Sequence, residues 1–284
     1  MHRPHSYRFD AGACGLVVHD WGGDGPPVLL AHATGFHGVV WAPVAERLIA
    51  ARHRVWSFDF RGHGDSDVPA VETGAYSWAG FADDVLAVTL HLGLTGDPAL
   101  VACGHSKGGA ALLLGETKQP GTYSRIWTYE PIMFPAGPPR ENDRLGASAR
   151  KRRNEFTSKD EAYDNYASKP PLDTLTPETL RAYVDYGLRD RGDGVVALKC
   201  RPEVEAQTYA MAPDNGAWNV LPAVDADVLV ACGAVSRSID PDLARRISER
   251  LPHGRLEVFP GLGHFGPQQD PDAIAASIRR FATP

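Results

Sequence analysis

The sequence predicts an α/β fold, in which a mostly parallel sheet is flanked by helices and interrupted by one inserted helical segment. Short apolar runs alternate with longer helical patterns along most of the chain, and this alternation is typical of parallel strands that are connected by helices. The alternation stops between about residues 134 and 222, where helix formers dominate. Because ligands of such sheets bind at the carboxyl ends of the strands, we expect the chemistry directly after the apolar runs.

The individual elements follow from these patterns in chain order. The apolar runs are short, as buried strands are, whereas the helical patterns are longer. We expect strands at residues 16–21, 28–32, 55–58, 99–104, 126–129, 228–232 and 256–259. We expect helices at residues 41–51, 78–92, 107–118, 241–251 and 271–281.

The inserted segment is predicted to be a helical cap. Thr176 and Pro177 mark a helix start, because threonine caps exposed N–H groups and proline fits the first helical position. Prolines flank the segment on both sides: Pro131, Pro135, Pro138, Pro139 and Pro222. We therefore predict that residues 1–133 and 223–284 form the α/β core and that residues 134–222 form the cap.

Composition and charge exclude several classes of protein. Hydrophobic residues make up 43% and charged residues 23% of the 284 residues, which is typical of a soluble globular protein. The net charge of −6 disfavours nucleic acid as the main partner. The basic run at residues 150–153 is interpreted as a solvated helix face rather than as an anion-binding or membrane-binding patch.

The chain is expected to be cytoplasmic and without a membrane partner. Residues 1–10 are polar, and no apolar run is long enough to span a bilayer. The cysteines form no CxxC pair and no metal-ligand spacing; they are Cys14, Cys103, Cys200 and Cys232. Cys103 and Cys232 lie in apolar strands, where a free thiol is a small buried hydrophobe. We therefore expect no disulfides.

The strongest functional signal is the run Gly104-His105-Ser106-Lys107-Gly108, which follows an apolar strand and precedes a helix rich in small residues. This is a G-x-S-x-G motif in the strand, turn and helix context that it requires. Glycines allow a tight turn that exposes the serine hydroxyl. The N-terminus of the following helix places N–H groups and a positive dipole beside a developing oxyanion. Ser106 is therefore the candidate nucleophile.

With this motif, the sequence resembles the α/β-hydrolase superfamily over nearly its whole length. Three further stretches carry the resemblance: His32-Ala33-Thr34-Gly35-Phe36, Asp59-Phe60-Arg61-Gly62-His63-Gly64-Asp65-Ser66 and Gly261-Leu262-Gly263-His264-Phe265. The resemblance is closest to the capped group that includes small esterases, lactonases, cofactor-free haloperoxidases and haloalkane dehalogenases. It implies the α/β-hydrolase fold with a cap inserted into the core.

The resemblance assigns the oxyanion hole to the backbone N–H groups of Thr34 and Lys107. Ala33 departs from the family, which usually has glycine there, and alanine fits if its φ is negative. We expect the side chain of Lys107 to be solvated. The turn from Asp59 to Ser66 is interpreted as a structural neighbour of the oxyanion loop rather than as a catalytic element.

His264 is the expected general base. It follows the last apolar run and lies in a glycine-rich loop. Among the eleven histidines, it has the position that the chain order of serine, acid and histidine requires. His105 is interpreted as a packed residue at the end of a strand.

The acid of the triad has two candidates. Most of the superfamily takes it from the loop after the seventh strand, where this chain has Ser236. The next acid, Asp240, precedes Pro241 and has the pattern of a helix N-cap, which makes it a poor partner for an imidazole. Glu130 follows an earlier strand, at a position that part of the dehalogenase group and some lactonases use. We favour Glu130, which would orient His264; another acid or a serine–histidine dyad are the remaining alternatives.

These residues predict a serine hydrolase that cleaves a small-molecule ester or lactone through an acyl-enzyme on Ser106. Perhydrolysis, as in cofactor-free haloperoxidases, and carbon–carbon bond hydrolysis run on the same triad. A non-catalytic receptor for a small ligand is the alternative from another class. No motif for a metal or an organic cofactor is present, so none is expected. Aromatic and methionine side chains of the cap are expected to form mainly its own core: Phe156, Tyr163, Tyr166, Tyr183, Tyr186, Tyr209, Met211 and Trp218.

Overall fold

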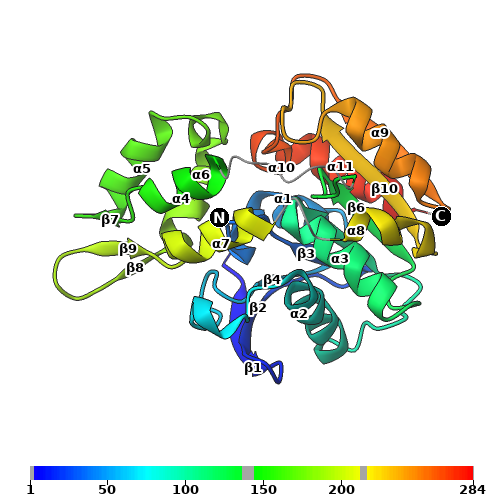
Figure 1. The fold of residues 1–284 in the computed structure, drawn as a ribbon, viewed down its shortest axis with the longest axis horizontal. Coiled ribbons are helices and arrows are strands. Elements are labelled where there is room, and N and C mark those ends of the chain that lie inside the picture. The colour runs from blue at the N-terminus through cyan, green and yellow to red at the C-terminus, as the bar shows by residue number, and fades with distance from the viewer. Residues whose placement is uncertain (1–2, 136–143, 212–215, 284) are drawn as a thin grey trace.

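The computed structural model describes residues 3–135, 144–211 and 216–283, and its core is an eight-stranded sheet in the order β1-β2-β4-β3-β5-β6-β10-β11 (Figure 1). The strands are β1 (His5–Asp10), β2 (Gly15–Gly22), β3 (Pro27–Ala31), β4 (Arg54–Asp59), β5 (Val101–His105), β6 (Arg125–Tyr129), β10 (Asp227–Gly233) and β11 (Gly254–Phe259). β2 runs antiparallel to β1 and β4, whereas the neighbouring pairs from β4 to β11 are parallel. The predicted mostly parallel sheet is therefore confirmed.

β1 is the one strand of this sheet that the apolar runs do not indicate. Its residues, HSYRFD, are exposed or half-buried. The strand lies at the edge of the sheet and pairs with β2. An edge strand that is partly exposed to solvent needs no continuous apolar run, so this strand has no apolar run to indicate it.

Helices cover both faces of the sheet. α1 (Ala42–Ala50) and α11 (Pro271–Ala282) pack on one face, and α2 (Trp78–His91), α3 (Lys107–Lys118) and α9 (Pro241–Arg250) pack on the other. Successive residues of β3 alternate between the two apolar clusters, with Leu29 and Ala31 in one and Val28 and Leu30 in the other. This alternation is what a strand buried on both faces requires.

The cap forms a separate group of elements beside the core in Figure 1. In the chain it is inserted between β6 and β10, which are neighbours in the sheet. It contains α4 (Arg144–Lys151), α5 (Lys159–Ala167), α6 (Pro177–Gly187) and α7 (Pro202–Met211). The hydroxyl of Thr176 caps α6 at the N–H of Thr179, as the sequence predicts. The cap also has a small antiparallel sheet of β7 (Glu155–Phe156), β9 (Val196–Leu198) and β8 (Leu188–Asp190). These strands have only two or three residues, which is too short for a detectable alternation.

The last part of the predicted cap packs against the core. The short helix α8 (Ala217–Val220) lies beside α3 of the core (Figure 1). Ala217 and Leu221 are fully buried in the same apolar cluster as Val228 of β10. The predicted end of the cap at residue 222 stays a prediction, and the name cap is used below for residues 144–211, whose last described helix is α7. The predicted proline joint at Pro138 and Pro139 lies outside the described residues.

The cysteines are free and buried. Cys103 and Cys232 are completely buried in β5 and β10, as the sequence predicts. The longest core helix, α2, has 14 residues. No helix in the described parts of the chain is long and apolar enough to cross a membrane.

Candidate active site

Ser106 lies in the tight turn between β5 and α3, as the motif predicts. Its φ of 55° and ψ of −114° are strained for a residue with a side chain. A Cβ at Gly104 would lie 2.4 Å from the nitrogen of Gly109, and one at Gly108 would lie 2.3 Å from the carbonyl oxygen of Ala31. The two motif glycines therefore allow α3 to begin directly against the sheet, beside the loop that follows β3.

Glu130 directly follows β6 and is completely buried. Its Oε2 lies 2.6 Å from Nδ1 of His264 and accepts a hydrogen bond from Oγ of Ser236 at 2.7 Å. Its Oε1 accepts the N–H of Gly233 at 3.1 Å. The contact between Glu130 and His264 that the sequence predicts is present. Ser236, which stands where the resemblance places the usual acid, thus donates a hydrogen bond to Glu130.

Asp240, the alternative acid, begins α9 instead. Its Oδ1 accepts the N–H of Leu243 at 2.8 Å, and Pro241 occupies the first helical position. The interpretation of Asp240 as a helix cap is therefore confirmed, and it is Glu130 whose carboxylate contacts the imidazole of His264.

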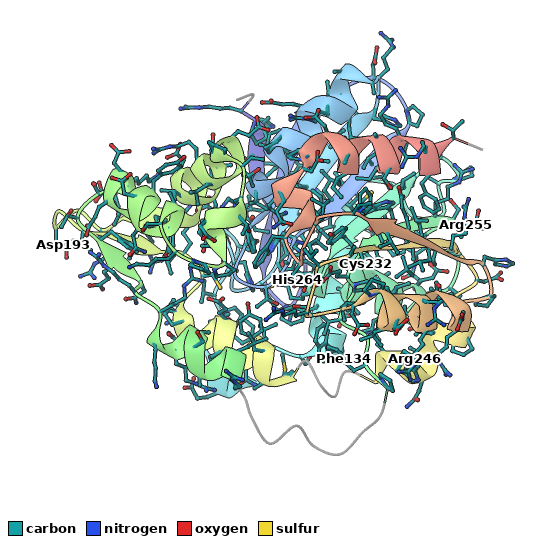
Figure 2. The ribbon with its side chains drawn as sticks, turned by 90° about the horizontal axis from the view of Figure 1, so that it is seen from above. Phe134, Asp193, Cys232, Arg246, Arg255 and His264 are labelled. Carbon is teal, nitrogen blue, oxygen red and sulfur yellow. The ribbon has the colours of Figure 1, made fainter. Side chains whose placement is uncertain are left out.

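The loop that carries His264 is held by two side chains of the sheet. The hydroxyl of Tyr129 donates to the carbonyl of Gly263 at 2.8 Å. Nε2 of His105 lies 2.8 Å from the carbonyl oxygen of His264 and must carry a proton, because a carbonyl only accepts. Burial, followed by the charge of His264, lowers the pKa of His105 well below its ordinary value. His105 is thus a packed strand-end residue, as predicted. In Figure 2, His264 lies where the cap meets the core.

The predicted oxyanion loop is fixed by the neutral ring of His32. Nδ1 of His32 donates to the carbonyl of Ala33 at 2.7 Å, and Nε2 accepts the N–H of Phe60 at 3.1 Å. Complete burial, and then the charge of Lys107, lowers the pKa of His32 well below its ordinary value. The φ of Ala33 is not in the left-handed region, so alanine is accommodated where the family usually has glycine. Thr34 lines the pocket described below.

The turn after β4 supports this loop from the side, as predicted. A carboxylate oxygen of Asp59 accepts the N–H of Gly38 at 2.7 Å, and the hydroxyl of Ser66 donates to the carbonyl of Asp59 at 2.6 Å. Arg61 and Asp84 form a buried ion pair at 2.7 Å. The side chains of Asp59, Arg61 and Ser66 thus form structural contacts with Asp84 and with the backbone.

The side chain of Lys107 is buried, which contradicts the expectation that it is solvated. It is completely inaccessible to solvent. Its Nζ lies 3.4 Å from Nε2 of His63 and stands over the rings of Phe60 and Phe81, 4.2 Å and 4.7 Å from their centroids. Burial lowers the pKa of Lys107 to about 7. Because α3 begins directly against the sheet, its first side chain lies next to the turn that contains Phe60 and His63 and is covered by it.

A pocket of about 430 Å³ lies between the oxyanion loop and the cap. The core contributes Thr34, Phe36 and Phe265 to its lining, and Phe265 directly follows His264. The cap contributes aromatic, polar and charged side chains, which include Tyr166, Tyr183, Tyr209, Arg152, Lys169 and Glu205. The three tyrosines, expected mainly in the core of the cap, therefore also face the pocket.

Arg152 corrects the interpretation of residues 150–153 as a solvated helix face. Its side chain is only 19% exposed and lines the pocket. Its guanidinium donates to Oε2 of Glu205 at 2.6 Å and to the hydroxyl of Tyr183 at 2.7 Å. Helix α4 ends at Lys151, so Arg152 no longer follows the helical periodicity of the run and turns inward.

A model of the Alpha/beta hydrolase family matches residues 28–277. The chain belongs to this family. This match confirms the resemblance and the α/β-hydrolase fold that the sequence predicts. It also supports hydrolase chemistry of the kind found in this family.

Relatives of this α/β hydrolase have diverse names. The "Probable oxidoreductase EphD" of Mycobacterium tuberculosis is 34% identical over 120 residues, which are 42% of this chain and 19% of that protein. The chain thus matches about a fifth of the length of this relative. The "Non-heme chloroperoxidase" of Streptomyces lividans is 26% identical over 278 residues, which cover 94% of this chain and 95% of that protein. The crystal structure of E-2-(Acetamidomethylene)succinate Hydrolase shares the fold, with a TM-score of 0.81, 23% identity and 98% coverage of both chains.

Proposed function

We propose that this α/β hydrolase is a serine hydrolase that cleaves an ester or lactone bond of a small molecule through an acyl-enzyme on Ser106. The observation that carries the proposal is the buried carboxylate of Glu130, 2.6 Å from Nδ1 of His264. A carboxylate that orients an imidazole beside a strained serine turn is the arrangement that activates a hydroxyl nucleophile. A pocket large enough for a small molecule lies beside these residues, since Thr34 of the predicted oxyanion loop and Phe265, which follows His264, line it.

The mechanism follows from the proton positions. Glu130 accepts from Nδ1 of His264, so the lone pair of Nε2 is left to take the proton of Ser106 as its oxygen attacks the carbonyl carbon. The backbone N–H groups of Thr34 and Lys107 stabilise the oxyanion. His264 then protonates the departing alcohol. Water, activated by the same histidine, releases the acyl group and restores Ser106.

Perhydrolysis is a second candidate reaction, favoured by the full-length similarity to a protein named a chloroperoxidase. In that reaction hydrogen peroxide replaces water as the acceptor of the acyl group and forms a peracid. Comparing peracid and acid formation from one ester, with and without peroxide, separates the two reactions. Carbon–carbon hydrolysis and a receptor role have no such observation in their favour; turnover of an activated ester would contradict a non-catalytic receptor.

A fluorophosphonate probe should label this protein at Ser106 alone, because only an activated hydroxyl beside an oxyanion hole reacts quickly. Peptide mapping after labelling identifies the modified residue. The Ser106→Ala variant is the control and should neither be labelled nor hydrolyse an activated ester, while its circular dichroism spectrum stays unchanged. Labelling of another serine, or full activity in the alanine variant, would overturn the assignment of the nucleophile.

A further inference from the structure

We propose that the substrate carries a carboxylate group, which Arg152 binds in the pocket between cap and core. The inference rests on the proposed hydrolase function and adds the chemical class of its substrate. It makes Arg152 a residue that determines specificity.

The first observation is the charge of the pocket. Three cationic side chains, Arg152, Arg153 and Lys169, line it together with a single carboxylate, Glu205. This excess of positive charge is found in a chain whose net charge is −6. Arg153 also pairs with Glu161 outside the lining at 2.6 Å, but the lining itself carries more positive than negative groups, and such a cleft focuses its field on a ligand of opposite charge. The pocket is therefore suited to an anionic ligand.

The second observation is the set of hydrogen-bond donors around Arg152. Its guanidinium donates to Glu205 at 2.6 Å and to the hydroxyls of Tyr183 and Tyr166 at 2.7 Å and 3.3 Å. These contacts account for three of the five N–H donors of a guanidinium. Each tyrosine hydroxyl that accepts from Arg152 keeps its own proton to donate. A planar carboxylate is the ligand that such a fork of donors matches best.

The third observation is the short separation between this group and the oxyanion loop. The carboxylate of Glu205 packs against Gly35, where a Cβ would lie 2.7 Å from Oε1. Gly35 follows Thr34, whose N–H is the proposed oxyanion donor. A substrate whose carbonyl lies at Thr34 therefore needs only a short spacer to bring a carboxylate to Arg152. Monoesters of short dicarboxylic acids, and lactones that carry a carboxylate, meet this requirement.

The test compares two esters of the same length. The p-nitrophenyl monoester of glutaric acid carries the carboxylate, and its methyl ester, methyl p-nitrophenyl glutarate, is neutral. We expect the wild type to have the higher kcat/KM on the charged ester. Arg152→Gln should lower the ratio of the two kcat/KM values about tenfold or more, mainly through KM, because one charged hydrogen bond to a ligand is lost.

Glu205→Gln should change the same ratio in the opposite direction. It removes the carboxylate that competes with the substrate for Arg152, so the preference for the charged ester should rise. Arg189→Gln, which removes an exposed cation from β8 outside the pocket lining, is the matched control and should leave the ratio unchanged. If Arg152→Gln fails to fold, the rise in Glu205→Gln decides the question.

The outcomes distinguish a failure of the proposed hydrolase function from a failure of carboxylate recognition by Arg152. If the wild type hydrolyses neither ester, the proposed hydrolase function is contradicted. If it hydrolyses both esters without preferring the charged one, and neither Arg152→Gln nor Glu205→Gln changes the ratio, the hydrolase function stands and carboxylate recognition by Arg152 is wrong.

Discussion

Glu130→Gln should lower kcat on an activated ester by about two to four orders of magnitude. The glutamine side chain has nearly the shape of glutamate but can donate a hydrogen bond from its amide to Nδ1 of His264. The proton of the imidazole then resides on Nε2, which can no longer accept the proton of Ser106. The measurement is kcat on p-nitrophenyl butyrate, with the fold checked by circular dichroism.

Asp240→Asn is the matched control, since asparagine caps helices nearly as well as aspartate. Both its stability and its rate should change little. If Asp240→Asn is inactive and Glu130→Gln is near normal, the acid belongs after the seventh strand, and Glu130 has only a structural role. Ser236→Ala should lie between these two variants, because it removes one of the donors to Glu130 and leaves the contact with His264.

The parts of the site that the sequence predicted are those fixed by backbone position. Ser106, Glu130 and His264 all follow strands of the parallel part of the sheet, so identifying these strands also brings the three residues to one edge. The sequence pattern at Asp240 predicts its role as a helix cap correctly because a helix start is a local feature. Ser236 in the usual position of the acid is the signal that leads from the sequence to Glu130, whose carboxylate contacts His264.

The side chains that the sequence misplaced depend on long-range packing. A lysine at the first position of a helix is normally exposed, but the turn around His63 covers Lys107. The run of four basic residues at 150–153 suggests one solvated helix face. The helix ends at Lys151, however, so Arg152 and Arg153 no longer belong to that face. The two or three residues of each cap strand likewise depend on their partners rather than on their own pattern. No local pattern contains this information.

Lys107→Met should increase the free energy of unfolding at and below pH 7, by roughly several kcal/mol. Methionine has a similar length and no charge to desolvate, and it can pack against the rings of Phe60 and Phe81, which Nζ of Lys107 now approaches at 4.2 Å and 4.7 Å. A buried ammonium has lost its water and has gained no carboxylate in direct contact among the described residues. Its charged form is therefore the costly one.

The pH dependence of the gain distinguishes this cause from better packing. Burial lowers the pKa of Lys107 to about 7 from an ordinary value of 10.5, so between these values the unfolded chain binds the proton that the folded chain has released. Wild-type stability therefore rises with pH through this window. Since Lys107→Met lacks the group, its advantage should be full below about pH 7 and should shrink towards pH 10.

Urea unfolding, followed by tryptophan fluorescence at several pH values, measures the difference between the two proteins. Other titrating groups are shared by both and largely cancel. Lys118→Met is the control: it removes a half-exposed lysine from the same helix, so it should change stability little at any pH. A gain for Lys107→Met that is the same at all pH values would show that packing alone is responsible. A loss at low pH would show instead that the charged ammonium is stabilised by the nearby Asp59 and Asp84, whose charges favour its protonated form, together with the two aromatic rings.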